Sequence, residues 1–330
     1  MDPTPLRSGM DGPVVRELQD RLIQAGFTTE PDGTYAGATE AAVRAFQDAR
    51  GLLVDGICGP ETWGALIESG FAPGDRLLYL CQPMLRGDDV AELQRRLNGL
   101  GFDAGREDGI LGPETEAALR LFQRDAGLVT DATCGPETVA ALVRLGSLAE
   151  GSVARVRERE TLRRDLRRLD ARGCFVVADP GLAVLGAEVA RRLREHGAVV
   201  ALDASGSEPS VVAADANQFR ADLFLALGTG AVPGARCAYF ATDHFRSEGG
   251  FAIATQLSAV LTTVLPDLGP PVGRTYQVLR ETRMAAVVCE LYSRDDPAGA
   301  TALTSLVPRL ADAMVEGIRR GVEAPLDVTP

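Results

Sequence analysis

The sequence predicts a multidomain protein: two small all-α three-helix modules, then an α/β domain with a mainly parallel, Amidase_3-like sheet. A helical segment occurs twice in the N-terminal half with nearly the same spacing, and beyond it apolar runs of strand length alternate with helical stretches. The expected divisions are a first module at 1–72, a second at 73–146, a linker helix at 147–172, the α/β domain at 173–323 and a tail at 324–330.

The composition is that of a globular protein, with 45 % hydrophobic and 24 % charged residues among 330. A formal net charge of −12 repels phosphate backbones, so we expect no nucleic acid partner. No apolar stretch has the length of a membrane span and no secretory signal is visible, so we expect no membrane insertion and a cytoplasmic location. The six cysteines include no CxxC pair and are expected to be buried thiols.

Each N-terminal repeat predicts three short helices. In the first copy, Leu18 and Leu22 lie on one apolar stripe, and Asp32-Gly33 is typical of a turn. We expect Thr39 to begin the second helix and Gly59-Pro60 to open the third, since proline suits the first helical turn. Neither copy contains a histidine or a nucleophile with a base, which favours a binding or docking module over an enzyme.

The second copy repeats these positions. Leu18 matches Leu93, Phe46 matches Phe122, and the run from Cys58 to Thr62 recurs at 134–138. The pattern resembles the peptidoglycan-binding module of cell-wall hydrolases, over 7–69 and 83–145. The resemblance implies a shallow groove for a peptidoglycan stem peptide or a related precursor.

Five residues are candidates for that groove: Trp63, Asp32, Asp55, Asp108 and Asp131. Trp63 could stack on a ligand, but a tryptophan on a helix is also a common core residue. The second copy has Val139 at its position.

Between the modules and the α/β domain, a stretch rich in arginine follows a Gly- and Ser-containing break. Leu162, Leu166 and Leu169 are spaced for one helical face. We interpret the segment as a linker helix docked by this face. A basic helix that contacts an acidic partner is the alternative.

The α/β domain is expected to contain six strands and four helices. The predicted strands are 174–178, 199–202, 221–227, 238–241, 276–279 and 286–291, and the predicted helices are 183–195, 211–220, 249–265 and 302–322.

Several motifs in this domain resemble the zinc-dependent N-acetylmuramoyl-L-alanine amidase family. They are VVADPG, NQFRADLFLALGTGA, YQVLRETRMAAVVCELYSRDDP and LADAMVEGIRRGV. The resemblance implies three zinc ligands, His, Glu and His, with an open position for water. It also implies that Glu290 occupies the position of the general-base carboxylate.

The ligand positions depart from the family. Leu182 stands at the first histidine position and Gly228 at the second, and the segment that carries the glutamate is absent before the helix at 183. The nearest acid, Glu188, lies inside that helix. We therefore expect no metal and no cofactor, with Glu290 persisting as a vestigial base. A zinc site rebuilt from Asp243, His244 and Glu290 is the alternative.

The combination of modules and a degenerate amidase domain resembles an actinobacterial family of cytoplasmic, non-catalytic regulators of peptidoglycan precursor synthesis. That resemblance implies stimulation of the UDP-GlcNAc enolpyruvyl transferase MurA, contact with the lipid II export machinery and control by a Ser/Thr kinase. Thr329 is the candidate phosphorylation site. Two other functions stay open: a zinc amidase acting on peptidoglycan or muropeptides, and a cytoplasmic sensor of muropeptides or precursors.

Overall fold

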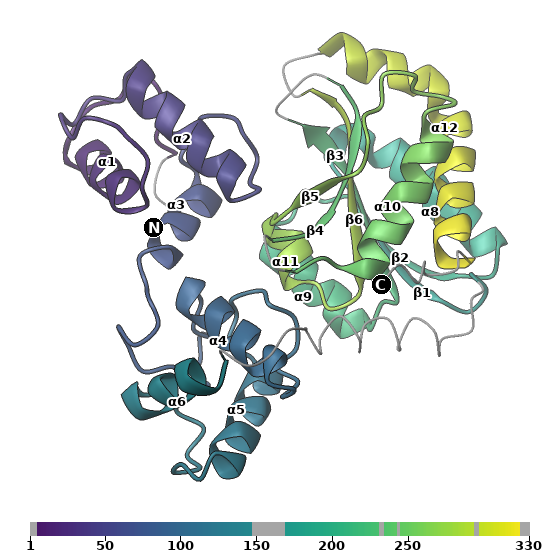
Figure 1. Cartoon of the computed structure of the whole chain (residues 1–330). Helices are drawn as coiled ribbons and strands as arrows, with labels where there is room; N and C mark the ends of the chain where they lie inside the picture. Colours follow the sequence, from purple (N-terminus) through teal and green to yellow (C-terminus); the bar gives the residue numbers. More distant parts are fainter. Residues whose placement is uncertain (1–4, 147–168, 231–233, 243–244, 294–296, 324–330) are drawn as a thin grey trace. The chain divides into compact units, whose positions relative to one another are not determined.

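A computed structural model describes residues 5–146, 169–230, 234–242, 245–293 and 297–323. The chain divides into two compact units. The first contains the helical modules apart from Gly51–Asp55, and the second contains the α/β domain (Figure 1). The predicted linker helix is outside the described residues except for its end, where Leu169 is buried in the core of the α/β domain.

Each module has three helices. Those of the first are α1 (Pro13–Gln24), α2 (Gly37–Ala49) and α3 (Pro60–Glu68), and those of the second are α4 (Asp88–Gly99), α5 (Pro113–Asp125) and α6 (Pro136–Gly146). Helix α2 begins at Gly37, two residues before the predicted start. Edge-to-face aromatic pairs lie at matching places in the two cores, Phe27 with Phe46 and Phe102 with Phe122.

In each module, a buried glutamine on each of the first two helices forms hydrogen bonds to the turn that follows that helix. Gln19 donates from Nε2 to Asp32 Oδ1 at 2.9 Å and to Thr39 Oγ1 at 2.9 Å, and its Oε1 accepts from the Gly33 amide at 2.8 Å. The same type of contact recurs at Gln47, Gln94 and Gln123. Each module is therefore two overlapping helix–turn–helix units that share the middle helix.

Replacing Gln19 by Ala is expected to lower the free energy of unfolding of the first module by about 2 kcal/mol, because the Gly33 amide and the Thr39 hydroxyl lose a buried partner. The protein has one tryptophan, Trp63 on α3, so its fluorescence reports on this module. Urea unfolding followed at Trp63 measures the effect. Gln24→Ala, at the exposed end of the same helix, is the matched control. Equal shifts in the two variants would contradict the assigned role.

The α/β domain is built on a six-stranded sheet in the order β2-β1-β3-β6-β4-β5. The strands are β1 (Gly173–Ala178), β2 (Val199–Asp203), β3 (Leu223–Gly230), β4 (Arg236–Phe240), β5 (Val272–Arg274) and β6 (Ala285–Ser293). The pairings of β1 with β2 and β3, of β3 with β6 and of β4 with β5 are parallel, and β4 runs antiparallel to β6. The mainly parallel sheet predicted from the sequence is confirmed.

Helices cover both faces of this sheet. They are α8 (Ala183–Glu195), α9 (Pro209–Phe219), α10 (Glu248–Leu261), α11 (Gln277–Glu281) and α12 (Pro297–Glu323). Helices α8, α10 and α12 pack together on one face, and α9 and α11 lie on the other (Figure 1). The main core includes Val287, Cys289 and Leu291 of β6. Because side chains alternate along a strand, Val288 and Glu290 point to the face of α9 and α11.

One predicted strand is wrong. Residues 276–279 do not extend the sheet, since Tyr276 precedes helix α11 and the edge strand β5 ends at Arg274. Gln277 donates to Ser210 of α9, so α11 is held as a helix by its packing against α9. The Thr-Tyr-Gln-Val run favours a strand locally, but the tertiary contact with α9 stabilises the helix instead.

In the part of the chain that the structure describes, no helix combines the length and the apolarity that crossing a bilayer would require.

Candidate functional site

Glu290 lies near the carboxyl end of β6, and only 3 % of it is exposed. In the sheet register it lies opposite Gly228 of β3 on one side and Arg236 of β4 on the other. The sequence motif therefore places a carboxylate at the carboxyl edge of a parallel strand, where α/β proteins commonly place functional groups.

Two side chains engage the Glu290 carboxylate. The Tyr276 hydroxyl donates to Oε1 at 2.7 Å, and Nε of Arg236 lies 3.2 Å from Oε2. The pKa of the Tyr276 hydroxyl is raised, mainly by burial and further by the charge of Glu290, so it stays a donor at neutral pH. The guanidinium supplies the positive charge that a buried carboxylate requires.

The second expected ligand position provides no donor. Gly228 has no side chain, and a Cβ built there would lie 3.3 Å from Asp179 Oδ2. The same carboxylate oxygen of Asp179 accepts from the Thr229 amide at 3.2 Å. Gly230 is also close to the site, since its Cβ would lie 3.1 Å from Glu290 Oε2. The end of β3 beside Glu290 is thus occupied by backbone atoms and by the carboxylates of Asp179 and Glu290.

The first expected ligand position faces the core. Leu182 ends a 3-10 turn (Pro180–Leu182) and is buried in the cluster that contains Cys289 and Leu291. Glu290 points to the opposite face of the sheet. Leu182 and Glu290 are therefore not brought together.

The third ligand has no counterpart. Helix α8 starts at Ala183, directly after the turn, as the sequence predicts for a deleted ligand segment. Glu188 lies within α8, where Arg191 and Arg192 donate to its carboxylate. The Glu188 carboxylate is therefore engaged in ion pairs within α8 and is not part of the Glu290 site.

Tested against the chemistry of a zinc site, these positions do not fit. A catalytic zinc needs three protein donors and an open coordination position. Leu182 and Gly228 supply none, and both oxygens of Glu290 already have partners. Among the described residues, no group of three His, Cys, Asp or Glu side chains is placed to hold a metal. Asp243 and His244, the basis of the alternative zinc site, lie outside the described residues.

The aspartates proposed for the module grooves have structural contacts. Asp32 accepts from Gln19 and from the Thr34 amide, and the pKa of its carboxyl is lowered first by that amide and then by Gln19. Asp131 is held in the same way by the Thr133 amide and Gln123.

Asp108 lies in the turn that corresponds to that of Asp32, and Asp55 in the turn that corresponds to that of Asp131. Asp108 accepts from Gln94 and from the Ile110 amide. Asp55 precedes Gly56, whose amide donates to Gln47. The carboxylate contacts of Asp32, Asp108 and Asp131 explain why Asp recurs in these three turns, and ligand binding by the four aspartates stays a prediction.

Trp63 is half-buried on α3. The Arg21 guanidinium lies 5.6 Å from the centre of its ring and also forms an ion pair with Glu17. Its counterpart Val139 packs against the core of the second module. The first module therefore presents an aromatic ring beside a cation at a place where the second presents an aliphatic side chain.

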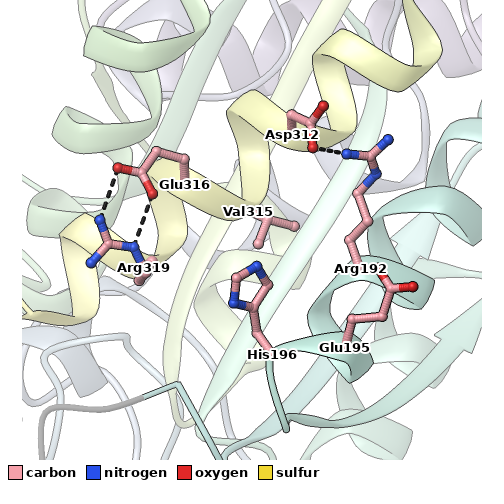
Figure 2. A pocket seen from close by; sticks show the side chains of 7 residues that line it. All are labelled: Arg192, Glu195, His196, Asp312, Val315, Glu316 and Arg319. Atoms are coloured by element: carbon pink, nitrogen blue, oxygen red, sulfur yellow. Dashed lines mark hydrogen bonds and ion pairs between the residues drawn. The ribbon is translucent and has the colours of Figure 1, made fainter.

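A pocket of about 300 Å³ lies between α8 and α12 (Figure 2). It is lined by Arg192, Glu195, His196, Asp312, Val315, Glu316 and Arg319. Arg192 pairs with Asp312, and Arg319 pairs with Glu316. His196 follows the last residue of α8, which runs back from the carboxyl end of β1, so the pocket lies at the opposite end of the sheet from Glu290. It is an ion-paired helix surface and does not belong to the Glu290 site.

The acid stability of α8 is expected to depend on Glu188. Hydrogen bonds from Arg191 and then Arg192 lower its pKa to about 2, from an ordinary value of 4.5. A lowered pKa stabilises the folded state above pH 4.5, and this contribution is lost as the pH falls toward 2. Glu188→Gln should therefore unfold more easily than the native protein at pH 6, and the difference should shrink on acidification. Thermal melts from pH 6 to pH 3 measure this, with Asp215→Asn on α9 as control. A difference that is constant with pH would contradict it.

Comparison with known proteins identifies the family. Two segments, 11–66 and 86–142, match the putative peptidoglycan binding domain. The N-acetylmuramoyl-L-alanine amidase CwlM of Mycobacterium tuberculosis is 35 % identical over 96 % of this chain and 88 % of its own length. The chain belongs to the CwlM family. The N-acetylmuramoyl-L-alanine amidase CwlL of Bacillus licheniformis is 36 % identical, over 43 % of this chain and 46 % of its own length.

Among solved structures, the N-acetylmuramyl-L-alanine amidase Ami1 of Mycobacterium smegmatis matches 48 % of this chain and 100 % of that chain, with 14 % identity and a TM-score of 0.40.

In this member of the CwlM family, the sequence identified Glu290 but missed both of its partners. Arg236 comes from an antiparallel strand far away in the sequence, and Tyr276 precedes a helix that was interpreted as a strand. The available signal in the sequence was a basic residue, Arg236, just before a predicted strand. That it pairs with Glu290 follows only from the antiparallel pairing of β4 with β6.

Proposed function

We propose that this protein is a non-catalytic regulator or scaffold of peptidoglycan precursor synthesis, built on an amidase pseudoenzyme and acting in the cytoplasm. Its proposed partner is the UDP-GlcNAc enolpyruvyl transferase MurA. Membership of the CwlM family and two peptidoglycan-binding modules support a place in cell-wall metabolism. The state of the Glu290 site supports a role other than hydrolysis.

One observation carries this proposal. Both oxygens of Glu290 are engaged, by Tyr276 and Arg236, so the carboxylate is not poised to take a proton from an attacking water. No zinc can polarise the scissile carbonyl without donors at the positions of Leu182 and Gly228. What remains is a stable α/β scaffold.

The test of the catalytic part uses the purified full chain, with zinc content measured and muropeptide cleavage followed in added zinc. An active zinc amidase serves as the positive control. We expect no stoichiometric zinc and no release of stem peptide. Cleavage that Glu290→Gln abolishes would overturn the proposal. It would favour the amidase activity for which the Mycobacterium tuberculosis relative is named.

The test of the regulatory part measures enolpyruvyl transfer by the MurA of the same organism, with and without the full chain. We expect a higher rate at saturating substrate, reached at a fixed stoichiometry of the two proteins. A Ser/Thr kinase is a further proposed partner, although Thr329 lies outside the described residues. No binding and no change in rate would refute the assignment of this partner.

A muropeptide or precursor sensor is the second candidate, and the half-exposed Trp63 favours it. Titration of the full chain with a muropeptide, followed by calorimetry and by Trp63 fluorescence, tests this function. Saturable binding that Trp63→Ala removes would support it, with Val139→Ala in the second module as the matched control. An absence of heat and of fluorescence change would refute it.

A further inference from the structure

Two cysteines face each other across an antiparallel strand pair of the α/β domain. Cys237 of β4 lies directly opposite Cys289 of β6, and their Sγ atoms are 3.6 Å apart. Both residues are fully buried and both are free thiols. This pair is separate from the contacts of Glu290, although each cysteine adjoins one member of the Arg236–Glu290 ion pair in sequence.

The strand register suits a covalent bond. Residues directly opposite each other in an antiparallel pair have Cα atoms about 4.5 or 5.5 Å apart, depending on the hydrogen-bonding position. Both separations fall within the range of about 4.4–6.8 Å seen in disulfides. Because the sulfur atoms are already in contact, a bond requires only a short movement of the two side chains.

The two thiols of the pair also differ in acidity. A hydrogen bond with the Cys289 thiol lowers the pKa of Cys237, against the effect of burial. The thiolate is the reactive form of cysteine, which favours Cys237 as the first nucleophile and Cys289 as the resolving thiol.

We propose that Cys237 and Cys289 form a modification site at which a peroxide oxidises the two thiols to a disulfide that links β4 to β6. The Cys237 thiolate attacks one peroxide oxygen, the O–O bond breaks, and Cys237 becomes a sulfenic acid as water leaves. The Cys289 sulfur then attacks the Cys237 sulfur, its proton leaves with the hydroxyl as a second water, and the S–S bond forms. Two thiols and one hydrogen peroxide thus yield one disulfide and two waters.

Access to the pair follows from its place in the sheet. β4 lies beside β5, an edge strand of three residues that pairs with it at Val272–Arg274. Short edge elements open more readily than central strands, so local opening of β5 and β4 is the route for a small oxidant. Oxidation should therefore be slower than at Cys81, which is partly exposed in the segment before α4.

The Cys237–Cys289 disulfide would cross-link β4 and β6, the two strands that carry Arg236 and Glu290. The disulfide joins the strands next to the Arg236–Glu290 pair, so it would hold these two side chains together when the edge of the sheet opens. The inference does not depend on the proposed function.

The experiment treats the native full chain with graded hydrogen peroxide, quenches with an alkylating reagent under denaturing conditions, and maps the peptides by mass spectrometry. We expect a linked peptide pair that contains Cys237 and Cys289 and lacks two hydrogens, and its reversal by dithiothreitol. Cys289→Ser should abolish the linkage and leave Cys237 as a sulfenic acid that a dimedone probe captures. Cys174→Ser, at a buried thiol of β1, should leave the linkage intact.

Two results would overturn the proposal. One is that both thiols stay alkylatable at peroxide concentrations that oxidise Cys81 completely. The other is that the linkage appears only when urea is added before the peroxide, which would show that the native pair does not react. Circular dichroism of each variant before oxidation confirms that it is folded.

Discussion

Arg236→Ala is expected to lower the free energy of unfolding of the α/β domain by about 3 kcal/mol, because it leaves the Glu290 carboxylate buried without its cation. The Glu290 side chain is 4 % exposed and that of Arg236 is 19 % exposed. The carboxylate cannot turn to water, and Tyr276 alone replaces only part of its hydration. Hydrogen exchange of the amides in β6 and β4, followed by mass spectrometry, measures the loss within this domain.

The charge itself is tested by a second change. Arg236→Ala combined with Glu290→Gln removes both charges and keeps a side chain of the same shape that can accept from Tyr276. We expect the double variant to recover most of the loss, because no buried charge is left unpaired. Should the single and the double variant be equally unstable, the packing of Arg236 and not its charge would be responsible.

The repeat and the strand–helix alternation could be predicted from the sequence because both are local patterns. Leu18 and Leu22 carry the helical period, and the Asp-Gly and Gly-Pro steps mark the turns. The strand at Val287 and Cys289 is a continuous apolar run bounded by polar residues. Such signals need no knowledge of what packs against them.

Of the candidate site, the sequence could predict Glu290 and the absence of the zinc ligands, but not the contacts that surround them. Sequence motifs show that Leu182 and Gly228 stand where donors are expected, but not that Leu182 packs into the core on the other face of the sheet. Likewise, the recurring Asp of the modules was a candidate for a ligand groove, whereas Asp32 accepts a hydrogen bond from Gln19 that closes a turn. These roles depend on partners distant in the sequence, which periodicity cannot identify.

Gly317→Ala and Gly321→Ala are each expected to lower the stability of the α/β domain by about 2 kcal/mol, despite the better helix propensity of alanine. Both glycines lie on α12 where it crosses α10. A Cβ at 317 would lie 2.8 Å from Leu257 Cα, and one at 321 would lie 2.7 Å from Ile253 Cα. The atoms in the way include backbone, so no change of rotamer relieves the contact and the two helices must separate.

The double variant Gly317→Ala, Gly321→Ala should lose less than the sum of the single losses, because one separation of α10 and α12 accommodates both methyl groups. Arg309→Ala, at an exposed position of the same helix, is the matched control and should stay within about 0.5 kcal/mol of the native protein. Hydrogen exchange of the α10 amides distinguishes a local separation from a general loss of stability. If α10 were as protected in the variants as in the native chain, the close approach of these helices would not matter to the stability of the domain.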